Sequence, residues 1–188
     1  MAVSTLSQNT THSLSSWGEN FSIHYILSLD LVSQWRRCGH IADFLANYHV
    51  FNFKHPEKAF SALSTVTNEL LENAIKFSTS PNKSVSLSLE RYYKTILVKT
   101  VNSTKKKYAD ELNSFSSDLI NFDPIQLFQS RLEQVATNPN STSGIGLLSI
   151  INDYEAAVNT KILPKIDTPN TYEVTVCITL NSDIIDSI

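Results

Sequence analysis

The segment TVTNELLENAIKFS, residues 65–78, carries an acid, an amide and a base on one side of a predicted helix. At about 100° per residue, Asn73 projects roughly 40° from Glu69, and Lys76 projects roughly 20° to the other side of Glu69. The apolar stripe of this helix is separate and consists of Val66, Leu70, Ala74 and Phe77. An amide oxygen can ligate Mg²⁺, a carboxylate can accept a proton beside the metal, and an ammonium group can contact phosphate.

Lys76 and the later lysine run also have a purely structural interpretation. Glu72 and Lys76 form an i, i+4 pair, which stabilises a surface helix by a few tenths of a kcal/mol. The run Lys105–Lys107 could face phosphate or could be a solvated group of charges. Both interpretations stay open for each lysine.

Glycine usage marks a second place where chemistry could occur. The chain has four glycines, where average usage would give roughly 13. Gly144 and Gly146 stand together before a predicted helix, so the backbone there needs a freedom that a Cβ would deny. A helix N-terminus entered in this way can bind an anion such as phosphate. The alternative is a tight loop that packs against the sheet, and a lone GxG does not decide between them.

The elements that must position these residues follow from periodicity. Segments with apolar and polar alternation predict strands at 21–29, 84–90, 94–101, 160–166 and 171–180. Helical spacing predicts helices at 29–49, 56–77, 123–136 and 144–158. In the third helix, Asp123 is the predicted N-cap, Pro124 the first helical residue and Gln126 the end of a capping box. Its apolar stripe is predicted as Ile125, Phe128, Leu132 and Val135.

Length and composition limit the organisation of the chain. The 188 residues fit one domain over 20–188, preceded by a polar, aperiodic tail over 1–19. Residues 102–143 are polar at both ends and are predicted to be a lid-like insertion in that domain.

Charge and hydropathy exclude several classes of function. A net charge of −3 and a pI near 5.9 give no basic surface for nucleic acid or anionic lipid. Two isolated cysteines provide neither a disulfide framework nor a metal motif. The N-terminus lacks the basic and apolar regions of a signal peptide, and no apolar run approaches the roughly 20 residues of a membrane helix. We therefore expect a cytoplasmic protein without nucleic-acid or membrane partners.

Two motifs, in this order, resemble those of a known family. NELLENAIKFS, residues 68–78, is similar to the N box, and TSGIGLLSIINDY, residues 142–154, to the glycine box of the GHKL ATP-binding (Bergerat) fold. This fold is shared by histidine-kinase catalytic domains, gyrase and anti-sigma-factor kinases. The matching order of elements covers about residues 21–180. The small size looks most like the free-standing bacterial anti-sigma-factor and SiaB-like kinases of partner-switching systems, which phosphorylate a serine or threonine on a small partner.

The resemblance implies roles for particular residues. Asn73 corresponds to the Mg²⁺-binding asparagine, and Glu69 to the general base of the ATPase and anti-sigma-kinase branches. Cofactor contacts are implied for Lys76, for Asn102 and for the glycine box. The glycine-box residues are Gly144, Ile145, Gly146 and Leu147, of which the two glycines approach the phosphates.

The adenine box departs from the family pattern. The family has DxGxG after a strand, whereas this chain has NSTKKK, with Asn102 in the position of the aspartate and no glycine after it. An asparagine oxygen can still accept from the adenine N6 amino group while its amide donates to a ring nitrogen. Replacing a charged acceptor by a neutral one costs on the order of 1 kcal/mol, close to tenfold in affinity. The β-branched Thr104 is a poor substitute for a pocket glycine.

We therefore expect an α/β (α+β) two-layer sandwich, with a mixed, largely antiparallel sheet and helices on one face. The leading hypothesis is a Mg-ATP-dependent serine/threonine kinase that acts on a small regulatory protein, such as an anti-sigma-antagonist-like phosphoacceptor. A second hypothesis is a degenerate domain that no longer binds nucleotide and acts as a protein-binding module. A third is the detached catalytic half of a histidine kinase. Apolar surface on the first helix leaves a homodimer open.

Overall fold

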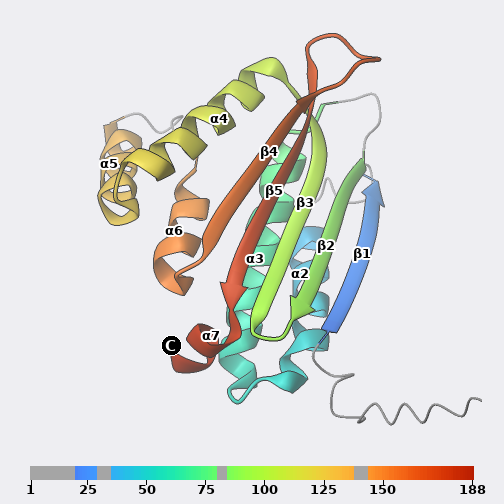
Figure 1. Cartoon of the computed structure of the whole chain (residues 1–188), viewed down its shortest axis with the longest axis vertical. Coiled ribbons are helices and arrows are strands. Elements are labelled where there is room, and N and C mark those ends of the chain that lie inside the picture. The colour runs from blue at the N-terminus through green and yellow to red at the C-terminus, as the bar shows by residue number, and fades with distance from the viewer. Residues whose placement is uncertain (1–19, 29–34, 80–83, 138–143) are drawn as a thin grey trace, which may run out of the picture.

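A five-stranded sheet forms one layer of the structure, a computed structural model that describes residues 20–28, 35–79, 84–137 and 144–188. Its strand order is β1-β2-β3-β5-β4, and every pairing among these strands is antiparallel (Figure 1). The strands are β1 (Asn20–Ser28), β2 (Ser84–Tyr92), β3 (Thr95–Lys105), β4 (Ala157–Pro164) and β5 (Thr171–Asn181). The predicted sandwich is confirmed, while the sheet is antiparallel in its described strands instead of mixed.

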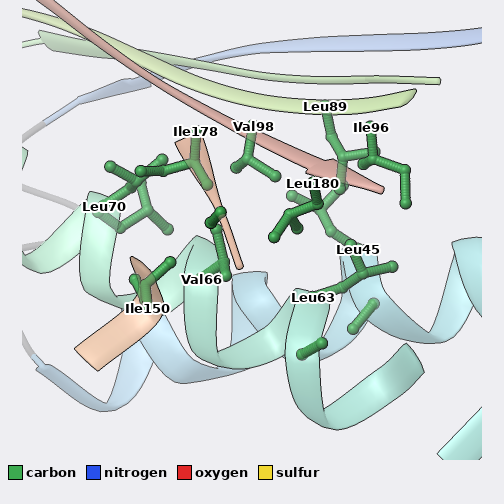
Figure 2. Close-up of a cluster of buried hydrophobic side chains, with 14 of the residues drawn as sticks. Leu45, Leu63, Val66, Leu70, Leu89, Ile96, Val98, Ile150, Ile178 and Leu180 are labelled. Atoms are coloured by element: carbon green, nitrogen blue, oxygen red, sulfur yellow. The ribbon is translucent and has the colours of Figure 1, made fainter. Parts of the chain in front are cut away.

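Helices form the second layer. Three of them cover the same face of the sheet, as Figures 1 and 2 show: α2 (Trp35–His49), α3 (Pro56–Lys76) and α6 (Ile145–Tyr154). The short segments η2 (Val50–Asn52) and α7 (Ser182–Ser187) both contact α3. The remaining helices, α4 (Lys106–Asn121) and α5 (Pro124–Thr137), lie to one side, beyond the edge strand β4 (Figure 1).

The core lies between these layers. Its residues recur with the two-residue period of a strand on the sheet and with the 3.6-residue period of a helix on α3, as the sequence predicted. On β2, Val85, Leu87 and Leu89 are buried, and the residues between them face away from the helices. On α3 the buried positions recur every three to four residues and include Leu63, Val66 and Leu70, which Figure 2 shows pointing toward the sheet. This packing fixes which side of α3 is left for a functional site.

The structure differs from the prediction at residue 102. Strand β3 does not end at Val101 but continues to Lys105, because residues 102–105 keep pairing with β5, down to Lys105 opposite Thr171. The polar segment that follows is the helix α4, which the sequence analysis did not predict. The predicted tail at 1–19, the turn residues 80–83 and the end of the predicted insertion at 138–143 lie outside the described residues.

Helix α5 begins as predicted. The Asp123 carboxylate accepts hydrogen bonds from the backbone N–H groups of Ile125 (3.0 Å) and Gln126 (3.1 Å), which confirms the N-cap. The predicted apolar stripe was wrong in part, because Ile125 and Leu132 are exposed. Phe128 packs against the core as predicted, and Leu127, which the predicted stripe did not include, packs there with it.

Candidate functional site

Glu69 and Asn73 lie one turn apart on α3 and contact each other. The Asn73 side-chain amide donates a hydrogen bond of 2.7 Å to Oε1 of Glu69. The helix holds both side chains beside the buried stripe that contains Val66 and Leu70, so they stand at the border of the core. This bond uses the side-chain amide nitrogen, and the side-chain oxygen Oδ1 of Asn73 has no donor among the described residues. That oxygen can therefore serve as a ligand.

The environment of Glu69 favours its protonated form. Burial raises the pKa of this carboxyl above its ordinary value, and the nearby Glu72 carboxylate adds to the increase. The hydrogen bond from Asn73 and the charge of Lys76 oppose this increase without cancelling it. A carboxylate with a raised pKa is a better proton acceptor than an ordinary one, which suits a general base.

The first turn of α6 packs directly onto Glu69. Gly144 precedes the helix with φ of 86°, a conformation that side chains rarely adopt. A Cβ on Gly146 would clash with the Oε1 atom of Glu69, so the helix can approach the carboxylate only because residue 146 is glycine. The structure thus brings the two sequence-predicted places together in space.

Asn102 is buried on the helix-facing side of β3, where its side chain is 6% exposed. It lines the same cavity as Asn73 and Gly144. Within the described ranges its side-chain amide has no hydrogen-bond partner. Its neighbour Thr104 differs in this respect, because its hydroxyl donates to the backbone carbonyl of Phe77 at 2.6 Å. The polar atoms of the Asn102 side chain are not fully enclosed, so water in the cavity can hydrogen-bond them.

The cavity between α3, β3, β5 and α6 has a volume of about 70 Å³. Its polar lining comes from Asn73, from Asn102 and the threonines of β3, and from Tyr108 and Glu111 of α4. Most of its wall is apolar, and the apolar side chains are Leu70, Ala74, Phe77, Leu112, Phe115, Leu147, Val174 and Val176. Such a volume holds a few water molecules and lies well below the roughly 300 Å³ at which ligand pockets begin.

Helix α4 closes the cavity on one side, through residues that the sequence analysis missed. Leu112 and Phe115 belong to the wall, and Phe115 is buried. Its ring would lie 2.8 Å from a Cβ at Gly144, so it rests directly on the glycine box. A hydrogen bond of 2.7 Å between the hydroxyls of Ser116 and Thr160 ties α4 to β4. The spacing of Leu112, Phe115 and Leu119 was the signal that could have predicted this helix.

Other predicted residues occupy different places. Leu147 lines the cavity, and Ile145 starts α6 in a half-buried position without belonging to the wall. Lys76 is exposed, and its Nζ atom lies 5.2 Å from the centre of the Phe77 ring, outside the wall of the cavity. Lys106 and Lys107 form exposed i, i+4 pairs with Asp110 and Glu111.

The donor set fits magnesium and a triphosphate. Mg²⁺ takes one or two protein oxygens and completes its shell with phosphate and water, which matches the side-chain oxygen of Asn73. In the described part of the chain, no cluster of three or more His, Cys, Asp or Glu side chains could hold a metal alone. A nucleotide needs more than the 70 Å³ of the cavity, so it fits only if side chains of α4 move outward.

The fold and site together define a two-layer α/β sandwich with a largely apolar cavity between its long helix and a helix entered through glycines. A chain in the crystal structure of the SiaB–SiaC complex from Pseudomonas aeruginosa shares this fold, with a TM-score of 0.56 and 14% sequence identity. The match covers 94% of this chain and 100% of that chain. No family model and no curated protein matches the sequence.

None of the helices within the described ranges combines the length and apolar character needed to cross a lipid bilayer.

Proposed function

We propose that this protein is a regulatory serine/threonine protein kinase that binds Mg-ATP in the cleft between α3 and α6. The observation that carries the proposal is the contact of Glu69 with both Asn73 and the glycine-entered turn of α6. It supports the proposal, because a proton acceptor, a magnesium ligand and an anion-binding helix N-terminus would then lie together. Sequence motifs for the N box and glycine box of the GHKL family support the same assignment.

Each residue of the site has a separate task in the proposed reaction. The Asn73 oxygen would hold the magnesium ion, while Glu69 accepts the proton of a serine or threonine hydroxyl on the partner. The first turn of α6 orients the phosphates through its backbone N–H groups. When bound, Mg-ATP supplies the phosphoryl group that the deprotonated hydroxyl takes, and ADP leaves.

The proposed partner is a small regulatory protein. Support comes from the solved neighbour, a SiaB–SiaC complex in which a chain of the same fold is present. The protein would then work in bacterial partner switching, where phosphorylation of the small partner controls its binding to other proteins. A homodimer stays open as well, since Phe44 and Tyr48 are exposed on α2 and Phe51 on η2.

Calorimetric titration of the full chain with Mg-ATP and Mg-ADP tests nucleotide binding directly. We expect saturable heat of binding at nucleotide concentrations below 1 mM, on the order of ordinary ATP sites. Without a protein partner, water should accept the phosphoryl group, and ADP should form slowly. Label transferred from ATP to a partner purified with the chain should be acid-stable phosphoserine or phosphothreonine. Acid-labile label would instead support the detached catalytic half of a histidine kinase.

A second candidate function is a protein-binding module without nucleotide. The small volume of the cavity favours it, because Phe115 and Leu112 fill space that a base would need. The missing glycines after Asn102 favour it too. No heat with Mg-ATP or Mg-ADP at millimolar concentration would support this module and remove the kinase.

A further inference from the structure

Two large aromatic side chains are exposed, one turn apart, on α2. Phe44 is 56% exposed and Tyr48 is 55% exposed, although aromatic rings are usually found largely buried. The Tyr48 ring also contacts Phe21 of β1, with 5.3 Å between the ring centroids. These three rings, the aromatic face of α2, lie at the edge of the sheet where β1 is the outermost described strand (Figure 1). A contiguous apolar surface of this kind marks a place where something binds.

The chain itself supplies a segment that can cover this face. Residues 1–19 directly precede β1. A chain spans at most about 3.3–3.6 Å per residue, so Trp17 lies no more than about 14 Å from Phe21. Phe44 and Tyr48 are about 6 Å apart along the axis of α2, since each residue of a helix rises about 1.5 Å. The tryptophan can therefore reach either exposed ring.

The composition of the segment is compatible with an apolar surface. Residues 1–18 contain no Asp, Glu, Lys or Arg, whereas these residue types make up 18% of the whole chain. Contact with the exposed rings therefore removes no charged side chain from water, a step that would be costly. Leu14 and Trp17 are the large apolar residues of the segment nearest to β1. An indole ring buries a large apolar area while its N–H group can stay in water.

The short connection favours the chain's own segment over other occupants of this face. Three residues separate Trp17 from Phe21. A binding group on a short linker has an effective concentration in the millimolar range, so a contact with a dissociation constant below about 1 mM is formed most of the time. A second copy of the chain would need a comparable concentration in solution to compete for the same rings.

We infer that Trp17 and Leu14 dock on the aromatic face of α2 in the same chain. This face shares no residue with the wall of the cavity, so the inference does not rest on the proposed nucleotide site. The docked segment covers Phe44 and Tyr48, and a homodimer that used this face would first have to displace it.

Tryptophan fluorescence of the full chain tests this docking. The chain has two tryptophans, so the Trp35→Phe variant leaves Trp17 as the single emitter. We expect its emission at a shorter wavelength than that of a synthetic peptide of residues 1–19. Acrylamide should quench it at least about twofold less steeply than the peptide, because the indole is covered more than half of the time. Both values should stay constant over an about hundredfold range of protein concentration, as a contact within one chain requires.

Phe44→Ala in the same background should move the emission and the quenching of Trp17 toward the values of the free peptide. Phe122→Ala is the matched control and should keep the values of the docked segment. Phe122 is similarly exposed, at 59%, but it follows α4 beyond the opposite edge of the sheet (Figure 1).

Three results would overturn the inference. Free-peptide values for Trp17 in the Trp35→Phe protein would show that the segment does not dock. Docked values that Phe44→Ala leaves unchanged would place the contact away from α2. Docked values that appear only at high protein concentration would assign the contact to a second copy of the chain. If the melting curve shows that Trp35→Phe does not fold, the spectrum of wild type minus that of Trp17→Phe gives the emission of Trp17 and decides the same question.

Discussion

At the scale of single residues, Glu69 connects the two halves of the site. Its carboxylate accepts from Asn73 and packs against the first turn of α6, where Gly146 leaves room for it. Because the same group would accept the proton in the proposed reaction, its removal should affect transfer more than binding.

We therefore expect Glu69→Ala to bind Mg-ATP with wild-type affinity within about threefold while ADP release falls at least tenfold, in line with the usual contribution of a general base. The measurement pairs calorimetric titration with a coupled ADP assay on the same preparations. Glu57→Ala, at the exposed start of the same helix and outside the cavity wall, is the control and should keep its turnover. Unchanged ADP release in Glu69→Ala would remove the catalytic role.

The raised pKa of Glu69 has a consequence for stability as well. Between its unfolded pKa of about 4.5 and its higher folded pKa, the folded state holds the proton more tightly than the unfolded state. The contribution of Glu69 to the free energy of unfolding therefore falls as pH rises through this window. Glu69→Gln should remove that fall and melt a few degrees higher than wild type at neutral pH.

Urea unfolding of wild type and Glu69→Gln from pH 4 to pH 8 measures this difference. Taking the difference between the two proteins cancels the other titrating groups, including Glu90. The pKa of Glu90 is lowered, because hydrogen bonds from Tyr92 and Lys99 outweigh the opposing effect of its burial. A difference that stays constant with pH would contradict the raised pKa.

The sequence predicted which site residues are neighbours where the contact depends on spacing within one helix. Glu69 and Asn73 share a helix, so the 3.6-residue period alone places them side by side. The contact of Gly146 with Glu69 joins residues that lie far apart in the chain, and only the resemblance to a family suggested it. Phe115 was missed because nothing in its local sequence indicates which cavity its ring would fill.

At the scale of elements, α4 decides whether the cleft is open or closed. It follows β3 without a loop, and its exposed face carries the pairs of Lys106 and Lys107 with acidic residues one turn later. The sequence analysis took this polar face as evidence for an irregular insertion. The buried face, with Ala109 and Phe115, is narrow, and for that reason the helical period was easy to overlook.

Shortening the side chain that closes the cleft should make nucleotide entry easier. Phe115→Ala removes the ring that rests on Gly144, so we expect Mg-ATP to bind at least threefold more tightly. The same change leaves a cavity and should lower the free energy of unfolding by about 3 kcal/mol. Calorimetric titration measures the first effect and urea unfolding the second.

The control for Phe115→Ala is Phe128→Ala on α5. Phe128 packs against the core without lining the cavity, so its truncation should cost stability but leave nucleotide affinity unchanged. Phe115→Leu, which keeps more of the packing, should give an intermediate affinity. Weaker binding by Phe115→Ala than by wild type would show that the ring contributes to the nucleotide site instead of closing it.

At the scale of the whole molecule, the sequence predicted the layers better than the order of the strands. The strict alternation of apolar and polar residues along β5 and β2 predicted strands with one buried face. The short connection between β2 and β3 predicted that these two strands form a hairpin. That β5 would pair with β3, across the α4–α6 segment, required information on long-range contacts that periodicity lacks. The antiparallel direction of these strands follows from that pairing.

Acid stability is a property of the whole molecule, and we expect it to depend on His49, which lies where α2 meets β1. Its Nδ1 atom hydrogen-bonds the carbonyl of Leu45 at 2.9 Å, its ring packs edge-on against Phe21, and its buried Nε2 has no partner among the described residues. Burial lowers the pKa of His49, although the Leu45 carbonyl partly opposes this, and the charge of Arg91 lowers it further. The neutral ring is therefore the form that the fold accommodates.

A lowered pKa means that the unfolded state binds a proton before the folded state does. The stabilising contribution of neutral His49 is thus complete above the unfolded pKa of about 6.5, and it is lost as pH falls toward the folded pKa. We expect His49→Phe to lose less stability than wild type between pH 7 and pH 5, measured as the shift in melting temperature. His40→Gln is the matched control, because His40 is exposed on the same helix and should leave the wild-type pH dependence intact. Equal losses in wild type and His49→Phe would mean that acid sensitivity arises from other groups, and that the contact between α2 and β1 tolerates a charged ring.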